Sequence, residues 1–326
     1  MAVDPRQVGF LLLPEFSHLG LAAAIEPLFI ANWLAGQELY RWRTLSLDGE
    51  GVRASNGLAV PVNGGIAGTE FDALFVLASF DVRRHAGDTR LKAWLRRVAR
   101  HGATIGGIET GSEVVAAAGL LDGLPVSVHW DNLQGFAEVH TACRAVSQLH
   151  TAAPARLTCA GQSAILDMML AWIDGRHGGA LAGEIASHLM LTGWRRGDQP
   201  QPAPWVQAQP IADPVLEQAL ALMERHIEEP LSCAEIARRV GLSLRQLQRL
   251  FARELNATPV HHYQLVRLSK AHALLQQTDL SVTEIAVSAG FGSLEHFCRV
   301  YRRRFGCRPR DDRRQSVGAP VLRRRA

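Results

Sequence analysis

The sequence predicts an α/β domain, built on a parallel sheet with helices on both faces, followed by an all-α domain. Three observations support this prediction. The first 190 residues alternate short apolar runs with amphipathic helical stretches, which favours a parallel sheet covered on both faces. A stretch rich in proline and glutamine follows at residues 195–214. Beyond it every pattern is helical, and a motif of some 25 residues occurs twice.

Short apolar runs rich in Val, Ile and Leu are typical of strands buried on both faces, and they lie at residues 6–13, 72–79 and 103–108. Amphipathic helices are expected at 19–35 and 89–101, and residues 157–173 add a strand, a glycine turn and an apolar helix. Ligands of such sheets bind beyond the carboxyl ends of the strands. One rim should therefore carry the Pro14–His18 loop, Ser79–Phe80, Glu109–Thr110 and His129–Trp130.

The net charge of +4 hides an asymmetry between the two parts of the chain. From Leu231 onward there are 18 Lys/Arg against 7 Asp/Glu, whereas the preceding residues carry 17 against 24. A basic third attached to an acidic remainder indicates that nucleic acid is the partner of the last third only.

The five cysteines indicate a reducing compartment. Their number is odd, they are scattered, and none has metal-ligand spacing: Cys143, Cys159, Cys233, Cys298 and Cys307. The first residues read as a strand and not as a signal peptide, and no uninterrupted apolar span reaches roughly 20 residues. We therefore expect a cytoplasmic protein with no membrane segment, metal or cofactor.

The basic third contains an internal repeat. "EIARRVGLSLRQLQRLFARELNATP" (235–259) is similar to "EIAVSAGFGSLEHFCRVYRRRFGCRP" (284–309), at an offset of 49 to 50 residues. Each copy reads as a short helix, a glycine turn and a longer helix with basic and amide side chains, which is a helix-turn-helix pattern. The longer helix of such a unit enters the major groove of DNA. A solvated basic helical bundle is the alternative.

Residues 215–314 resemble the DNA-binding domain of the AraC/XylS transcription regulators, on the stretches "AEIARRVGLSLRQLQRLF", "VRLSKAHALLQQTDLSVTEIA" and "AGFGSLEHFCRVYRRRFGCRP". The ending "RPRDDRR" departs from the family's usual "SPxxYR". The resemblance implies that residues 243–254 and 293–305 are the recognition helices. The candidates to face the groove are Leu244, Arg245, Gln246, Gln248, Arg249, Ser293, Glu295, His296 and Arg299. Arg302, Arg303, Arg304 and Arg308 are expected to contact phosphates.

The first 190 residues resemble the class I glutamine amidotransferase-like (DJ-1/PfpI-like) superfamily, in the branch fused to AraC-type domains. The carrying stretches are "FSHLGLAAAIEPLFIANWLAG", "IGGIETGSEVVAAAGLLDG", "VSVHW" and "LTCAGQSAILDMML". The resemblance implies a flavodoxin-like sheet. It also implies domain limits of 1–194 for sensing and dimerisation, 195–214 for a linker, 215–314 for DNA binding and 315–326 for a basic tail.

Catalytic relatives carry a Cys before "TG", a His about 20 residues later and a Glu from the first helix near the Cys. Here those places hold Glu109, His129 and Glu26. A carboxylate is a poor substitute for a thiolate in acyl transfer, so we expect no catalytic residues and a pocket that survives as a sensor. The alternatives are a Glu109 that only favours the positive end of a helix, a His129–Trp130 pair in ordinary packing, and a Glu26 on a solvated helix face.

Two carboxylates in one pocket need a cation or a shared proton, and aromatic faces attract cationic groups. The expected ligand-binding residues are Phe16, Glu26, Phe80, Glu109, Thr110, His129 and Trp130. An acid before "TG" with "HW" after it resembles the regulators of glycine betaine, carnitine and arginine catabolism, which implies a small cationic or zwitterionic effector.

We interpret the chain as a one-component activator that binds double-stranded DNA, an effector and RNA polymerase, and that acts as a homodimer. The alternatives are an amidotransferase-like hydrolase or deglycase that uses Glu109 as base and His129 as its partner, and a DNA-binding protein whose first domain only dimerises.

Overall fold

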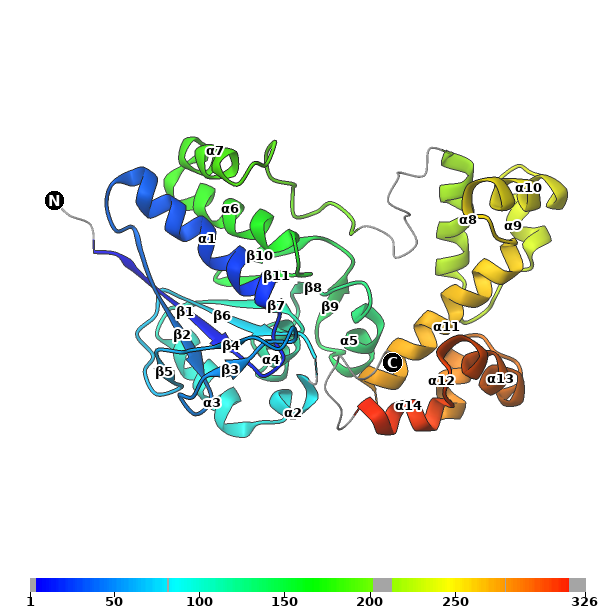
Figure 1. The fold of residues 1–326 in the computed structure, drawn as a ribbon, viewed down its shortest axis with the longest axis horizontal. Coiled ribbons are helices and arrows are strands. Elements are labelled where there is room, and N and C mark those ends of the chain that lie inside the picture. The colour runs from blue at the N-terminus through cyan, green and yellow to red at the C-terminus, as the bar shows by residue number, and fades with distance from the viewer. Residues whose placement is uncertain (1–3, 81, 202–212, 279, 317–326) are drawn as a thin grey trace. The chain divides into compact units, whose positions relative to one another are not determined.

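The computed structural model describes residues 4–80, 82–201, 213–278 and 280–316. These residues form two compact units, one that extends to Gln201 and one that follows it. The first is an α/β domain and the second is entirely helical, so the fold class predicted from the sequence is confirmed (Figure 1).

A seven-stranded sheet forms the centre of the first unit, in the order β10-β11-β7-β6-β1-β2-β5. All its neighbours are parallel except the β10–β11 pair at one edge. Its strands are β1 (Arg6–Leu12), β2 (Tyr40–Ser46), β5 (Gly64–Gly65), β6 (Ala73–Ala78), β7 (Thr104–Glu109), β10 (His150–Ala153) and β11 (Arg156–Cys159). Two small sheets are formed by β3 (Val52–Arg53) with β4 (Ala59–Val60), and by β8 (Pro125–Ser127) with β9 (Arg144–Val146).

Helices cover both faces of this sheet (Figure 1). One face packs on α1 (His18–Ala35), α6 (Ala164–His177) and α7 (Gly179–His188). The other packs on α3 (Thr89–Arg100) and α4 (Gly111–Ala117), with α2 (Val82–Ala86) against α4 and α5 (Leu133–Val139) beside β9. The central strands β1, β6 and β7 are buried on both faces, as expected for a sheet sandwiched between helices.

Helix α1 is the one described helix that is long and apolar enough to cross a membrane by length and composition alone. It packs as a core helix, because Leu21, Ala24 and Leu28 are buried against the sheet. Its opposite side exposes Leu19, Ala22, Glu26, Phe29 and Trp33. We call these five residues the α1 stripe. Their spacing alternates between three and four residues, which is the spacing of a helix-pairing seam.

Part of the segment expected as a linker is attached to the first unit. The Arg195 guanidinium forms an ion pair with the buried Asp167 of α6, with 2.6 Å between Nη2 and Oδ2. Further on, the Gln201 side chain donates to the carbonyls of Val128 and Gln148. Residues 195–201 therefore pack on the α/β unit, and the rest of the expected linker, 202–212, lies outside the described residues.

The second unit contains two helix-turn-helix units joined by one long helix. Its helices are α8 (Pro214–Arg225), α9 (Cys233–Arg239), α10 (Leu244–Leu255), α11 (Pro259–Gln277), α12 (Val282–Ser288), α13 (Leu294–Phe305) and α14 (Pro309–Ser316). Each helix-turn-helix has its own core, and α11 contributes to both, through Tyr263 to the first and Leu274 to the second.

The turn of the second helix-turn-helix packs against the segment between α8 and α9. Gly290 has φ 71°, and a Cβ on it would lie 2.1 Å from the carbonyl oxygen of Ile227. Arg267 of α11 donates to the carbonyls of Ala289 and Gly290 and lies over the Phe291 ring, 4.2 Å from its centroid. These contacts fix the second turn against the first half of the unit.

Candidate functional site

The end of strand β7 forms a sharp corner that displays Glu109. The residue has φ 55°, in the left-handed region that few non-glycine residues adopt. The corner is closely packed, because a Cβ on Gly111 would lie 2.0 Å from the Val76 carbonyl oxygen. Backbone strain of this kind is held in place by its surroundings and is concentrated at functional sites.

Neutral donors from three other strand ends surround the Glu109 carboxylate. Ser79, which follows β6, donates its hydroxyl to Oε2. Gln162, which follows β11, donates to Oε1 from its side-chain nitrogen at 3.0 Å and from its backbone nitrogen at 3.4 Å. The Ser17 hydroxyl, from the loop after β1, also hydrogen-bonds the carboxylate. The ends of β1, β6 and β7, which belong to the predicted rim, therefore lie together, and the loop after β11, which the prediction did not include, joins them.

Burial dominates the electrostatics of this carboxylate. Glu109 is 6% exposed, and burial raises its pKa, although the hydrogen bonds from Ser79, Gln162 and Ser17 oppose the rise. Among the described residues, the groups with the largest effects on its pKa include no cation. Because a buried negative charge is costly without a positive partner, burial favours the protonated, neutral form of this carboxyl group.

Glu109 does not act as the cap of the following helix. Helix α4 begins at Gly111 after Thr110, and the hydrogen bonds of the Glu109 carboxylate go to Ser79, Gln162 and Ser17 and not to the first amides of α4. A role limited to the helix terminus, which the sequence left open, does not match these contacts.

Close packing extends to the loop after β11. Gly161 has φ 109°, and a Cβ on it would lie 2.2 Å from Cγ of Glu109. The Glu109 side chain thus occupies the space that any side chain at position 161 would need. Glycine at position 161 is therefore required while Glu109 occupies this space.

The other expected ligand-binding residues lie in different environments. Thr110 is buried, and its hydroxyl has no hydrogen-bond partner among the residues that the structure describes. Phe80 is 40% exposed on the rim, whereas Phe16 is fully buried in the core. Trp130 is 37% exposed and stacks obliquely on His129, with 4.9 Å between ring centroids.

Glu26 lies away from the corner. It is exposed on α1, nine residues beyond Ser17, which is roughly 13 Å along the helix. It is also absent from the groups that affect the pKa of Glu109. The structure therefore does not bring the two carboxylates into one pocket, and the expectation of a paired-acid site is not met.

His129, the expected partner of Glu109, has its own local contacts. It follows β8, which belongs to a separate two-stranded sheet, and its Nδ1 accepts a hydrogen bond from the backbone N–H of Asp131 at 3.3 Å. Burial lowers its pKa, Asp131 opposes this effect, and Glu109 does not contribute. Within the described structure no hydrogen bond or ion pair joins the two side chains, so the base-and-partner arrangement of a hydrolase is not formed.

Cys159, the last residue of β11, is the thiol that the fold brings near the corner. It is fully buried, and its pKa is raised by burial and also by the nearby charges of Glu109 and Asp167. Only the thiolate is a strong nucleophile, so this thiol does not replace the one that Glu109 displaces. Sequence reasoning missed this proximity, along with the roles of Ser17 and Gln162.

The second unit displays the two predicted recognition helices. Helix α10 begins after Ser243, which forms a capping box with Gln246, and α13 begins after Ser293. Leu247 and Leu250 of α10 and Phe297 of α13 are buried in the two cores. All thirteen residues predicted to contact bases or phosphates are exposed, as residues that contact DNA must be.

Local hydrogen bonds restrict some of these exposed side chains. The carboxamide oxygen of Gln246 accepts from the backbone and hydroxyl of Ser243, both at 2.8 Å. Gln246 therefore cannot use both ends of its amide for an adenine while the cap is intact. Arg299 donates to Nδ1 of His296 at 3.0 Å. In the part of the chain that the structure describes, Arg245, Gln248 and Arg249 make no such bonds.

Two features of this unit were not expected from the sequence. Leu294 is 43% exposed at the start of α13, matching Leu244 at the start of α10, which is 41% exposed. The unusual "RPRDDRR" ending forms α14, whose Asp312 accepts a hydrogen bond from Tyr301 at 2.6 Å and lies 3.2 Å from Nδ1 of His272. The departure from the family pattern thus anchors the last helix to the second core.

Comparison with known proteins agrees with this geometry. Residues 236–315 match a family model described as "Helix-turn-helix domain". The HTH-type transcriptional regulator CdhR of Pseudomonas aeruginosa is 41% identical over 305 residues, which cover 93% of this chain and 90% of CdhR. The HTH-type transcriptional regulator GbdR of the same species is 39% identical over 321 residues, covering 98% and 87%.

Two solved structures are similar in fold to a large part of this chain. An AraC family transcriptional regulator from Pseudomonas putida superposes with a TM-score of 0.52 and 26% identity, covering 57% of this chain and 100% of that one. A ThiJ/PfpI family protein from Pseudomonas syringae gives a TM-score of 0.52 at 17% identity, covering 73% and 90%. At that identity the second likeness concerns the fold alone.

Proposed function

Since the chain belongs to the AraC family of helix-turn-helix transcription regulators, with an N-terminal DJ-1/PfpI-like domain, we propose that it is an effector-responsive activator. Its first unit binds a small cationic or zwitterionic metabolite, and its second unit binds two adjacent major-groove segments. It acts in the cytoplasm, where it recruits RNA polymerase.

The buried Glu109 carboxylate is the observation that carries the effector proposal. It is held by neutral donors without a cation among the groups that affect its pKa, and the Thr110 hydroxyl beside it is buried without a partner among the described residues. A cationic nitrogen of the ligand would neutralise the Glu109 carboxylate, and a carboxylate of the same ligand would accept a hydrogen bond from the Thr110 hydroxyl.

The effector would enter past the exposed members of the rim. Gln162 is exposed and donates an amide N–H to Glu109, which is the bond that a cationic group would replace. Phe80 and Trp130 are the partly exposed aromatics of the expected site, and an aromatic face attracts a quaternary ammonium or guanidinium group. Glycine betaine, carnitine and arginine share this combination of cation and carboxylate.

We infer that no catalysis accompanies binding. Glu109 and His129 are not joined, and burial keeps the Cys159 thiol protonated. The relatives named above are transcription regulators. The experiment is a thermal-shift screen of the full chain with glycine betaine, carnitine, choline and arginine, followed by a turnover assay with amide and glyoxal-type substrates. A stabilising ligand without turnover is expected, and turnover by the purified protein would contradict the proposal.

A second copy is proposed to cover the α1 stripe. The stripe is nearly symmetric about Glu26, so antiparallel pairing of two α1 helices brings Leu19 opposite Trp33 of the partner subunit and the small Ala22 close to Phe29 of the partner subunit. Phe29 and Trp33 are 53% and 61% exposed in the single chain. Large exposed apolar groups in one row are typical of an interface.

For DNA, Arg245, Gln248 and Arg249 are proposed to read bases, and Arg302 and Arg303 to contact phosphates. Replacement of Arg249 by Ala should weaken binding to the cognate site by about 1–3 kcal/mol and relax its sequence preference. Arg253→Ala is the matched control, because Arg253 lies on the same helix but pairs with Asp213 and Glu254. Fluorescence anisotropy with cognate and random duplexes measures both, and equal losses for Arg249→Ala on the two duplexes would rule out base reading.

A further inference from the structure

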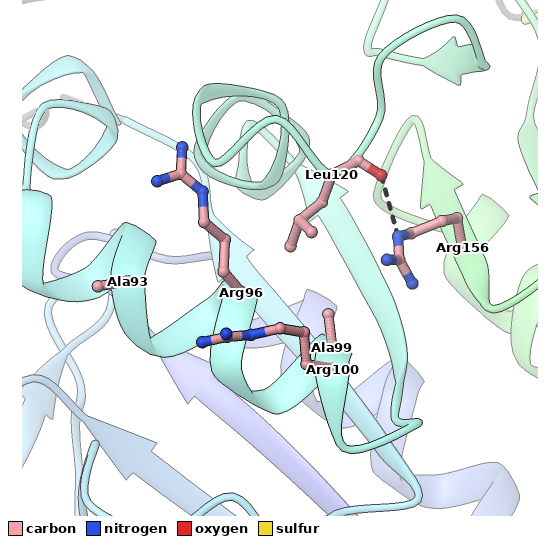
Figure 2. Close-up of a pocket in the computed structure, with 6 residues that line it drawn as sticks. All are labelled: Ala93, Arg96, Ala99, Arg100, Leu120 and Arg156. Atoms are coloured by element: carbon pink, nitrogen blue, oxygen red, sulfur yellow. Dashed lines mark hydrogen bonds between the residues drawn. The ribbon is translucent and has the colours of Figure 1, made fainter.

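Three arginines line a pocket on the edge of the first unit opposite to Glu109. Arg96 and Arg100 are one turn apart on α3, and Arg156 is the first residue of β11, so the pocket lies where the strands begin. The volume is about 530 Å³, and the floor is made of Ala93, Ala99 and Leu120. Figure 2 shows Arg96 and Arg100 on one helix and Arg156 beside Leu120.

Backbone carbonyls hold two of these side chains in place. Arg96 Nε donates to the carbonyl of Ala118 at 2.7 Å, and Arg156 Nε donates to the carbonyl of Leu120 at 2.9 Å (Figure 2). Both carbonyls follow the end of α4, where helix carbonyls lack partners within the helix. Arg156 Nη1 also donates to the carbonyl of Ala155 at 2.7 Å. Each guanidinium is thereby oriented, while Arg96 Nη1 and Nη2 and Arg156 Nη2 retain donors for another group.

No acid neutralises these arginines in the described part of the chain. None of the three forms an ion pair there, and burial alone lowers the pKa of Arg156, with no acidic group to oppose it. Helix α3 adds to the positive charge, since it contains five Lys/Arg and no Asp/Glu. This concentration stands out because the residues before Leu231 carry more acidic than basic side chains.

We propose that this pocket binds a small polyanion with phosphate or carboxylate oxygens, at a site separate from the Glu109 corner. Planar guanidinium groups bind such oxygens with two parallel hydrogen bonds. The pocket is open to solvent and part apolar, and its volume lies in the range of small-molecule sites. Non-specific contact with DNA phosphates needs no fixed orientation, so the two guanidinium groups held by backbone carbonyls, beside alanine and leucine side chains, favour a small molecule. The site gives the regulator a second input that is independent of the cationic effector.

The test measures binding of pyrophosphate and of citrate to the full chain by calorimetry, with Arg100→Ala compared with Arg97→Ala. Arg100 lines the pocket and makes no hydrogen bond or ion pair among the described residues, so its removal should not disturb the fold. Arg97 is exposed on the same helix and does not line the pocket. The two variants lose the same charge.

We expect at least one probe to bind to the native chain. Arg100→Ala should weaken the affinity for that probe about tenfold, the effect of one charged hydrogen bond, and Arg97→Ala should change it less than twofold. Binding of pyrophosphate alone would assign the site to phosphates, and binding of citrate would assign it to carboxylates. Equal losses of affinity in both variants would show that only the net charge of the helix matters, and would overturn the proposal. The proposal would also be overturned if neither probe bound, or if random DNA, and not the probes, bound with an affinity that depends on Arg100.

Discussion

Substitution of Glu109 by Gln tests the role of the corner carboxylate, because it preserves the shape of the side chain and removes its charge. In the native chain the carboxylate accepts hydrogen bonds from Ser79, Gln162 and Ser17, and no described cation is among the groups with the largest effects on its pKa. A ligand cation at about 4 Å gains roughly 4 kcal/mol at an effective dielectric constant of 20. Part of this gain is offset by desolvation of the ligand.

The expected loss of effector affinity is therefore about 1.5–3 kcal/mol, the range for hydrogen bonds to charged groups, which is roughly 10- to 150-fold in Kd. Stability should hold or rise at pH 8, because the pKa of Glu109 is raised by burial and the amide does not carry that cost. Calorimetry with the best-stabilising metabolite and thermal unfolding without it measure the two quantities.

Glu113→Gln is the matched control. Glu113 is also a buried acid, on the first turn of α4, and it is not among the groups that affect Glu109. Its replacement should leave effector affinity unchanged. The reasoning is refuted if Glu109→Gln binds the metabolite as tightly as the native chain, or if both variants lose affinity equally.

Three other predictions concern stability, pH and assembly. Burial raises the pKa of Glu113 from 4.5 to about 7, against the opposing charge of Arg83. This shift corresponds to a free energy of about 3 kcal/mol for ionising the side chain in the folded state. This acid therefore binds its proton more tightly in the folded state, so its contribution to stability falls as pH rises from about 4.5 to about 7. In urea titrations Glu113→Gln should stabilise the chain at pH 8 but not at pH 4. An equal effect at both pH values would contradict this. Gly290→Ala should cost about 1–3 kcal/mol more than Gly241→Ala, since both glycines have positive φ but only Gly290 lacks space for a Cβ; equal unfolding midpoints would disprove the difference. Phe29→Ala should weaken self-association of the full chain in sedimentation equilibrium, and Glu26→Gln should strengthen it by removing like charges at the proposed two-fold axis; an unchanged association constant in Phe29→Ala would exclude the α1 stripe.

Strong periodic signals allowed much of the fold to be predicted. The apolar runs became β1, β6 and β7, and the repeat became α9–α10 and α12–α13. Strand β2 was not recognised because its sequence, "YRWRTLS", mixes arginines with apolar residues, and four of its side chains are only partly buried or exposed. A strand with this composition has no clear apolar run to identify it.

Prediction of the candidate site succeeded for Glu109 and failed for Glu26, for a physical reason. The position of Glu109 follows from local order, because a buried strand running into a helix determines the corner. The position of Glu26 depends on which side of α1 meets the sheet, and α1 is apolar on nearly all sides, so the buried side cannot be identified from the sequence alone.

The unequal surroundings of Gly241 and Gly290 bear on how the two copies of the repeat can diverge. Nothing lies within 4 Å of a Cβ at Gly241, whereas one at Gly290 would meet the Ile227 carbonyl and Pro230. Asparagine tolerates positive φ, so the first turn can drift to asparagine with little loss of fitness. The second turn cannot, because any side chain there would push the two DNA-reading halves apart. Selection on the spacing between the recognition helices would therefore act through Gly290, although that residue is not among those proposed to contact DNA.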